Sequence, residues 1–452
     1  MKLIKTKSFW LSLLSLAIPM AFQDLIKNGL NLVDNIMVGK ASEIYLAAIN
    51  LANQPFFLFS IIISGLASGG TVLISQYYGK ENFKAINKII SITLSIALFF
   101  SLIFAFGIIL FPEFVMQIFT NETELILNGK RYLKIIGWTY LLFGISNAIL
   151  LILRSLKLMK MTLYINIISF LINVVLDYAL IFGKLGFPRM EIEGAALATF
   201  ISRLFEMLAM VIYILLCDKR IKIKIRDMFA LDKILLKDYF KYGMPVVINE
   251  LIWGIGIITF SVILGRLGTQ TVAASSVSSA VEQFVTVAIN GISNATAILI
   301  GNEIGAGKKE YTKQMSETLL FFSVALGLVL GLIFFALRMP MINFYDLEPQ
   351  TKILAMNFMA ITSFLVFTDS ISVIAINGIL RGGGDTKFVM WLDILAIWFV
   401  SLPFSALFAF VLHMPLELIF FALRSDVVVK VIVCLFRLRN DKWITNVTRN
   451  EV

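Results

Sequence analysis

The chain alternates long apolar runs with short polar connections. Twelve runs are long enough to cross a bilayer core of roughly 30 Å. They lie near residues 10–38, 46–76, 89–111, 132–153, 162–183, 194–216, 243–265, 272–302, 316–337, 353–380, 388–412 and 415–436. Apolar and polar positions do not alternate strictly within these runs, whereas a barrel strand needs only about ten alternating residues. The pattern therefore predicts an all-α polytopic membrane protein with twelve transmembrane helices.

The second half of this pattern repeats the first. Residues 19–79 align without a gap on residues 245–305, a shift of 226 positions, which is half of the 452 residues. The residues that coincide include Pro19 with Pro245, Gly39 with Gly265, Ala47 and Ala48 with Ala273 and Ala274, Gly65 with Gly291, and Gly79 with Gly305. Asp24 falls on Glu250, so the repeat also carries an acidic position inside an apolar run.

The repeat predicts two lobes of six helices each. We expect an N-terminal lobe at 1–216, a polar cytoplasmic linker at 217–242, a C-terminal lobe at 243–436 and a cytoplasmic tail at 437–452. Because six is an even number, both lobes enter the membrane in the same orientation, which predicts a pseudo-two-fold axis along the membrane normal. A transporter built in this way has its cavity between the lobes and alternates access by rocking one against the other.

Composition agrees with a membrane protein, since 59% of the residues are hydrophobic and 15% are charged. Of the 39 Lys and Arg residues, 26 fall on the side of the predicted topology that holds both termini, and nine on the other side. Cytoplasmic loops carry the excess of basic residues, so both termini are predicted to be cytoplasmic. The net charge of +10 then faces anionic lipid head groups and requires no nucleic-acid partner.

The residues that enzymes use are scarce. The chain has one histidine, His413, in a predicted outward turn, and two cysteines, Cys217 and Cys434, at helix ends. A membrane enzyme would need a metal cluster or a nucleophile with its base. We therefore expect neither an enzyme nor a bound cofactor.

Polar residues in the first predicted helix form one stripe. Asp24, Lys27, Asn31 and Asp34 lie within about a third of the helix circumference. A charge at the bilayer centre costs roughly 2.5 to 3.5 kcal/mol, so the stripe is expected to face protein or a water-filled cavity. Asp24 and Lys27 are spaced as an ion pair that could serve transport or simply stabilise the helix.

The fifth predicted helix carries a second polar face, formed by Asn166, Asn173 and Asp177. Asp34 and Asp177, brought together with amide neighbours, suit a proton or a hard monovalent cation, which prefers oxygen ligands. Interhelical hydrogen bonding alone is the alternative interpretation. No metal site is expected beyond Na⁺ at these two carboxylates.

Other intramembrane charges are predicted to contribute less. In the sixth helix, the pair Arg203 and Glu206 has the spacing of a structural ion pair. In the second half, Glu250, Glu282 and Asp369 are candidate contacts for a cation or a substrate. The run Arg-Gly-Gly-Gly-Asp at 381–385 follows a membrane span and lacks the pattern of a phosphate-binding loop, so we interpret it as a cytoplasmic turn.

Motifs spread over the chain resemble those of the multidrug and toxic compound extrusion (MATE) transporters. They are Asn-Leu-Val-Asp-Asn-Ile-Met-Val-Gly at 31–39, Ser-Gln-Tyr-Tyr-Gly at 75–79, Asn-Val-Val-Leu-Asp-Tyr at 173–178, Glu-Gly-Ala-Ala-Leu-Ala-Thr at 193–199, Gly-Met-Pro-Val-Val-Ile-Asn-Glu at 243–250, Gly-Asn-Glu-Ile-Gly-Ala-Gly at 301–307, Gly-Ile-Leu-Arg-Gly-Gly-Gly-Asp-Thr-Lys at 378–387 and Arg-Leu-Arg-Asn-Asp-Lys-Trp-Ile at 437–444. The resemblance implies export of organic, often cationic compounds in exchange for Na⁺ or H⁺. It also implies a multi-pass protein of the cell inner (plasma) membrane, which we expect to be a monomer.

The resemblance further implies roles for particular residues. A cation site in the N-terminal lobe maps onto Asp34, Asn173 and Asp177, with a sixth-helix threonine at Thr199. Glu250 and Asp369 resemble acidic residues that one branch of the family uses in its other lobe. Lys27 departs from the family pattern, and an ammonium within reach of Asp34 could replace a sodium ion.

The sequence leaves one alternative function and makes one prediction about the site of coupling. Related members of the superfamily move lipid-linked sugars across membranes, so a flippase is the alternative function. In the second half, Phe260 occupies the position that corresponds to Asp34. Phe404 corresponds to Asp177 when the alignment is shifted by one residue, the same shift that places Arg154 on Arg381. The scaffold is thus duplicated without its ion-site candidate, which predicts coupling in the N-terminal half.

Overall fold

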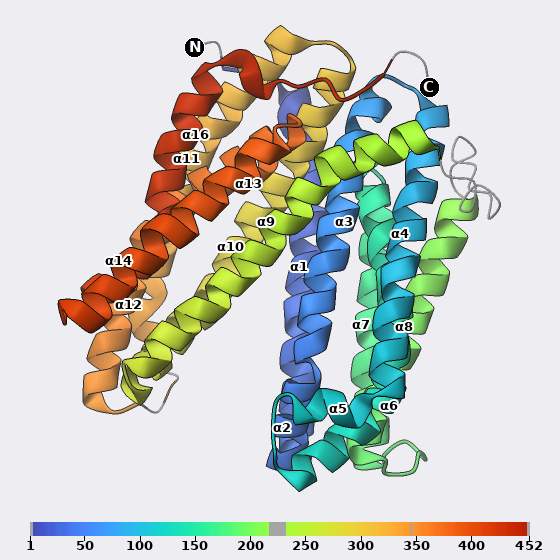
Figure 1. The fold of residues 1–452 in the computed structure, drawn as a ribbon, viewed down its shortest axis with the longest axis vertical. Coiled ribbons are helices and arrows are strands. Elements are labelled where there is room, and N and C mark those ends of the chain that lie inside the picture. Colours follow the sequence, from blue (N-terminus) through green and yellow to red (C-terminus); the bar gives the residue numbers. More distant parts are fainter. Residues whose placement is uncertain (1–2, 217–231, 344, 346, 450–452) are drawn as a thin grey trace. The chain divides into compact units, whose positions relative to one another are not determined.

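The fold is entirely helical in the part of the chain that the structure describes. This computed structural model describes residues 3–216, 232–343, 345 and 347–449. No strand occurs among these residues, and long helices follow one another along the chain (Figure 1). The predicted all-α class is therefore confirmed.

Eleven helical segments are long and apolar enough to span a membrane within the described ranges. The helices that build them are α1 (Lys7–Ala41), α2 (Glu43–Ala52) with α3 (Gln54–Gly79), α4 (Phe83–Leu110), α6 (Thr123–Ser155), α7 (Met159–Phe182), α8 (Glu191–Leu216), α9 (Lys233–Arg266), α10 (Thr269–Gly305), α11 (Lys309–Asn343), α12 (Pro349–Val373) with η2 (Ile374–Leu380), and α13 (Thr386–Ile394) with η3 (Leu395–Ser401), α14 (Leu402–Ala406) and η4 (Leu407–Val411). A short helix, α5 (Pro112–Gln117), precedes α6.

The region predicted as a twelfth span, 415–436, forms two consecutive helices. These are α15 (Leu416–Leu423) and α16 (Asp426–Arg439), with a break at Arg424 and Ser425. The side chain of Arg424 forms ion pairs inside the protein, described below, so a charged residue occupies the middle of this apolar run. A short 3₁₀ turn, η5 (Asp441–Trp443), follows α16.

Helix α9 begins earlier than the sequence suggests. The polar linker was predicted to reach residue 242, but the helix starts at Lys233. Asp232 caps this start, because its side chain accepts hydrogen bonds from the backbone N–H groups of Ile234 and Leu235 at 2.9 and 3.1 Å. The rest of the predicted linker, including Cys217, lies outside the described residues.

The structure divides into two compact units that are not contiguous in sequence. Unit 1 contains Met1–Ala21, Ser75–Lys80 and Ile248–Asn450, and unit 2 contains Phe22–Ile74 and Glu81–Val247. Three helices contribute to both units: α3 is divided after Ile74, and α1 and α9 are divided after Ala21 and Val247. The divisions of α1 and α9 are 226 residues apart, so they follow the sequence repeat.

Unit 2 is organised around α6. This helix packs against α2, α4 and α8, and α7 packs against α8. Aromatic side chains of α3 and α6 fill the centre, where the ring of Phe59 lies 4.9 Å from that of Tyr140 and 6.1 Å from that of Phe143. Such tilted contacts between buried rings stabilise a helix interface beyond the area that they bury.

Unit 1 is organised around α10 and α12. Helix α10 packs against α11, α12 and η2, while α12 also packs against α11 and α16. Phe358 and Phe420 stack at its centre with ring centroids 4.1 Å apart.

Two glycines of the sequence repeat have a packing role in unit 1. A Cβ atom at Gly79 would lie 1.9 Å from the carbonyl oxygen of Asn302, and one at Gly305 would lie 1.8 Å from that of Gln76. The ends of α3 and α10 therefore approach each other closely at equivalent positions of the repeat, and only glycine allows this approach.

Candidate functional site

A cluster of two carboxylates and one amide lies inside unit 2. Asp34 comes from α1, and Asn173 and Asp177 come from α7. With its nitrogen facing the two acids, the Asn173 amide donates to Asp34 Oδ1 at 2.9 Å and to Asp177 Oδ2 at 3.1 Å. Asn173 is fully buried and Asp177 is 1% exposed, whereas Asp34 is partly accessible. The structure therefore brings Asp34 together with two residues of α7 that are about 140 positions away in sequence.

Helical spacing explains the cluster. Asn173 and Asp177 are four residues apart, so both side chains project from the same face of α7. The Oδ1 atom of Asp177 has no hydrogen-bond partner among the described residues, and it is therefore available to a proton or a cation. Oxygen atoms of carboxylates and amides are the ligands that hard cations prefer.

Thr199, which the resemblance assigns to this site, forms its hydrogen bond within its own helix. The hydroxyl of Thr199 donates to the carbonyl oxygen of Ala195 in its own helix at 3.0 Å. In the described part of the chain, no hydrogen bond joins Thr199 to either carboxylate. Asn31 is exposed on α1. Asn166, predicted on the same face as Asn173, is partly buried, and its buried side-chain oxygen has no hydrogen-bond partner among the described residues.

The expected ion pair between Asp24 and Lys27 does not form. Asp24 instead lies 3.5 Å from Nη2 of Arg154, which comes from the end of α6. The guanidinium also donates two hydrogen bonds to Oε1 of Gln23, at 2.7 and 3.1 Å. A guanidinium has several N–H donors in one plane and can bind two neighbouring acceptors at once, whereas the Lys27 ammonium is a single point charge. In the same unit, Arg203 and Glu206 form their predicted pair at 2.7 Å.

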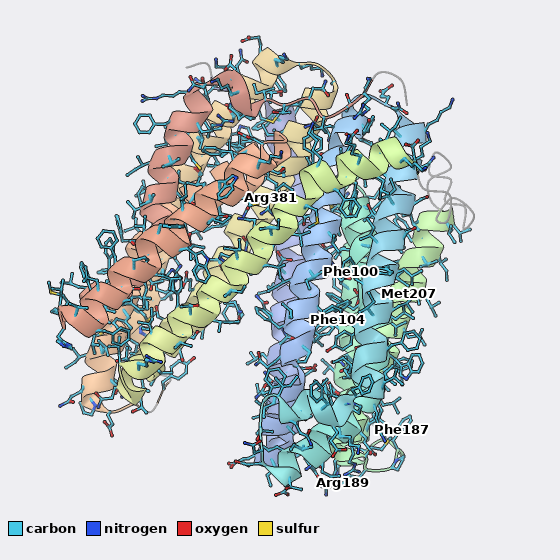
Figure 2. The ribbon with its side chains drawn as sticks, viewed as in Figure 1. Phe100, Phe104, Phe187, Arg189, Met207 and Arg381 are labelled. Carbon is cyan, nitrogen blue, oxygen red and sulfur yellow. The ribbon has the colours of Figure 1, made fainter. Side chains whose placement is uncertain are left out.

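The same arrangement occurs again in unit 1. Arg381 Nη1 donates to Glu250 Oε1 at 3.0 Å, and its Nη2 donates to Asn249 Oδ1 at 3.0 Å. Asn249 and Glu250 are the repeat equivalents of Gln23 and Asp24. The sequence repeat thus carries a complete arginine clamp, defined as an arginine that binds two consecutive polar residues on the first helix of its repeat. Arg381 is labelled in Figure 2.

A cavity of 570 Å³ lies within unit 1. The candidate acids Glu250, Glu282 and Asp369 all line it. Arg424, at the break between α15 and α16, binds Glu282 at 2.6 Å and Asp369 at 3.4 Å. Each of the three acids therefore lies beside a guanidinium.

A second ionic group lines the same cavity, and sequence reasoning did not assign it. Lys430 lies 2.6 Å from Asp393 and 2.8 Å from Asp426, and all three side chains are less than a tenth exposed. Asp393 also accepts a hydrogen bond from Asn249, and Asp426 accepts one from Ser401. Counting all charged residues inside the last two predicted spans would have found this group.

The described residues contain no group of three or more His, Cys, Asp and Glu side chains placed to hold a metal ion. The intramembrane charges are instead arranged as pairs, clamps and one carboxylate cluster in two repeated units. This arrangement is that of a duplicated multi-pass membrane protein.

The chain belongs to the MatE family, whose model matches residues 19–179 and 245–416. It is similar to the uncharacterized transporter YisQ of Bacillus subtilis, with 24% identity over 435 residues that cover 96% of this chain and 95% of that protein. It is also similar to the probable multidrug resistance protein NorM of Thermotoga maritima, with 26% identity over 438 residues that cover 95% and 92% of the two chains.

The fold is that of solved MATE structures. A crystal structure of MATE in the bent conformation has a TM-score of 0.85 and 18% sequence identity, covering 97% of this chain and 99% of that chain. The family and the fold identify a multi-pass membrane transporter rather than an enzyme, and family members need no cofactor.

Proposed function

We propose that this protein is a secondary active exporter of organic, often cationic and amphipathic compounds, driven by antiport of H⁺ or Na⁺. In this proposal Asp34, Asn173 and Asp177 form the cation-coupling site. The observation that supports it is the buried Asn173 amide between two carboxylates on different helices. The printed name of the NorM relative, a probable multidrug resistance protein, supports the class of cargo.

Physical chemistry favours a change of charge at this cluster. Two ionised carboxylates close together in a low-dielectric region repel each other and lose their hydration. A shared proton or a bound sodium ion removes much of this cost. The cluster is therefore more stable with a cation or a proton than without one, and its occupancy can alter the contact between α1 and α7.

Helix α1 can transmit this change. Pro19 lies inside the helix and interrupts its hydrogen bonding, and Gly29 has open space where a side chain would be. In our proposal, cation release or binding at Asp34 shifts α1 at these points and alters the cargo path in the N-terminal lobe.

The available driving force is sufficient. A membrane potential supplies about 2.3 kcal/mol per charge per 100 mV. Export against a roughly hundredfold concentration gradient requires about 2.7 kcal/mol. One or two ions per cycle therefore suffice.

Charge distribution supports the placement of the protein in the cell. Basic residues concentrate on the predicted side of both termini, so we propose an inner-membrane protein with cytoplasmic ends.

Glu250, Glu282 and Asp369 each have an arginine partner, so we assign them to the cavity wall of unit 1 rather than to coupling.

Ethidium export from proteoliposomes tests the proposal, with sodium and proton gradients imposed separately. We expect one of these gradients to drive uphill export, and Asp34→Asn to abolish it. Glu113→Gln is the matched control, because Glu113 is an exposed acid paired with Lys130 outside the carboxylate cluster. Uphill export by Asp34→Asn at the wild-type rate would refute the assignment, and translocation of a lipid-linked sugar without ethidium export would favour a flippase.

A further inference from the structure

Lys27 is an intramembrane cation that forms no ion pair with any of the residues that the structure describes. It lies 20 residues from Lys7 and 14 residues from Ala41, the two ends of α1. At 1.5 Å per residue these separations are about 30 and 21 Å, so the ammonium is far from lipid head groups at either end. Its side chain is exposed. No carboxylate among the described residues lies within 4.0 Å of its nitrogen.

The charges around Lys27 are already paired with one another. Those that act on it belong to Asp24, Arg203, Arg154 and Glu206. Asp24 binds Arg154, and Glu206 binds Arg203. These five residues therefore contain three basic and two acidic groups, and Lys27 supplies the unmatched positive charge.

The carboxylate cluster does not supply the missing partner. Asp34 is seven residues further along α1, a rise of about 10 Å. It shares the Asn173 amide with Asp177, and among the described residues it forms no ion pair with Lys27. The expectation that Lys27 replaces a sodium ion at Asp34 therefore has no support from this geometry.

The ammonium does not point toward lipid tails. The exposed apolar side chains Leu25, Leu32 and Ile36 lie on one face of α1, and at 100° per residue Lys27 lies about 160° and Asn31 about 120° away from the centre of that face. Both polar residues are exposed. An unpaired charge at this depth is costly unless it faces water or a polar ligand.

We propose that Lys27, with Asn31 one turn further along, binds an anionic oxygen group of the transported compound, a carboxylate in particular. The ammonium supplies the charge and the Asn31 amide supplies a second hydrogen-bond donor. Preferred cargo then carries a carboxylate in addition to its organic cation. This inference rests on the proposed export function and specifies its substrate class.

A matched pair of dyes tests the inference. Rhodamine 110 has a free carboxylate beside its delocalised cation, and rhodamine 123 is the methyl ester of the same molecule. Binding of each dye to the purified full chain in detergent micelles is measured by fluorescence anisotropy, with empty micelles subtracted. We expect the wild-type protein to bind rhodamine 110 more tightly than rhodamine 123 by about tenfold, which corresponds to about 1.4 kcal/mol.

Substitutions identify the residue responsible. Lys27→Gln should remove the preference for rhodamine 110 and leave rhodamine 123 binding unchanged, whereas Lys27→Arg should retain the preference. Lys84→Gln removes the same charge from an exposed position in the first turn of α4 and should have no effect. If Lys27→Gln does not fold, the wild-type comparison of the two dyes and the Lys27→Arg variant still decide the question.

The outcomes separate this inference from the export function. Equal wild-type affinity for the two dyes overturns the inference, as does an unchanged preference in Lys27→Gln, even if rhodamine 123 is exported uphill. Conversely, a Lys27-dependent preference for rhodamine 110 supports the anion site even if no imposed gradient drives export of either dye. That second result would reject the proposed antiport and leave the binding site in place.

Discussion

Replacing Lys430 by methionine tests whether burial decides how much an ion pair contributes to the free energy of unfolding of this protein. The Lys430 ammonium lies 2.6 Å from Asp393 and 2.8 Å from Asp426, and the three side chains are 8%, 9% and 9% exposed. Lys430→Met keeps an unbranched apolar side chain and removes the charge. Both carboxylates then remain buried without their counter-ion.

The expected cost is about 3 to 5 kcal/mol of unfolding free energy, the usual penalty for removing one partner of a buried ion pair. Hydrogen bonds from Asn249 and Ser401 remain, but they do not compensate the negative charges. Lys130 and Glu113 provide the comparison, because their separation is also 2.6 Å but their side chains are 35% and 52% exposed. Lys130→Met should cost about 1 kcal/mol or less.

The free energy of unfolding is obtained by titrating SDS into mixed micelles. Cys434 reports the unfolded fraction, since it is completely buried and a maleimide dye can modify it only after the surrounding helices separate. The experiment uses a Cys217→Ser background, so that Cys434 is the single thiol of the chain.

A difference of less than about 1 kcal/mol between Lys430→Met and Lys130→Met would refute the reasoning, because burial would then not separate two pairs of equal length. The double variant Lys430→Met with Asp393→Asn adds a second check. It should be more stable than Lys430→Met alone, since one of the two uncompensated charges has been removed.

Two further predictions concern packing and pH. Gly79→Ala should destabilise the protein by about 1 to 3 kcal/mol in the same titration, because its Cβ would meet the Asn302 carbonyl. Gly107→Ala is the control: it has open space around it and should be neutral or stabilising. Equal costs for the two variants would contradict the close approach. The hydrogen bond from Lys88 lowers the pKa of Asp232 in the folded state. The charged Asp232 carboxylate therefore stabilises the folded state fully above the unfolded pKa of about 3.9. This contribution is lost as the pH falls through the folded pKa. The destabilisation caused by Asp232→Asn at pH 7 should therefore shrink at acidic pH, and a cost that grew on acidification would contradict this sign.

The helical fold could be predicted from the sequence because membrane spans are local features. Each backbone polar group in a bilayer must be satisfied within its own helix, so length and hydropathy largely define a span. The exception was the region 415–436, where a single apolar run becomes two helices at Arg424. Its interruption depends on partners from α10 and α12, which are distant in sequence.

Partner choice could not be predicted from helical spacing. Asp24 and Lys27 have the spacing of an ion pair, yet Asp24 contacts Arg154, more than a hundred residues away. Spacing identifies side chains on one face of a helix, but it does not say which other helix approaches that face. The clamp formed by Arg381 was missed for the same reason, since sequence placed this residue in a cytoplasmic turn.

The sequence by itself determined the membrane class, the two repeats and the polar faces of α1 and α7, because these follow from composition and from periodicity along one helix. Only the tertiary structure decided that Asn173 bridges Asp34 and Asp177, that an arginine clamp accompanies each repeat and that Lys27 forms no ion pair within the described part of the chain. Those facts depend on which side chains meet across helices, and such meetings are set by the packing of the whole unit.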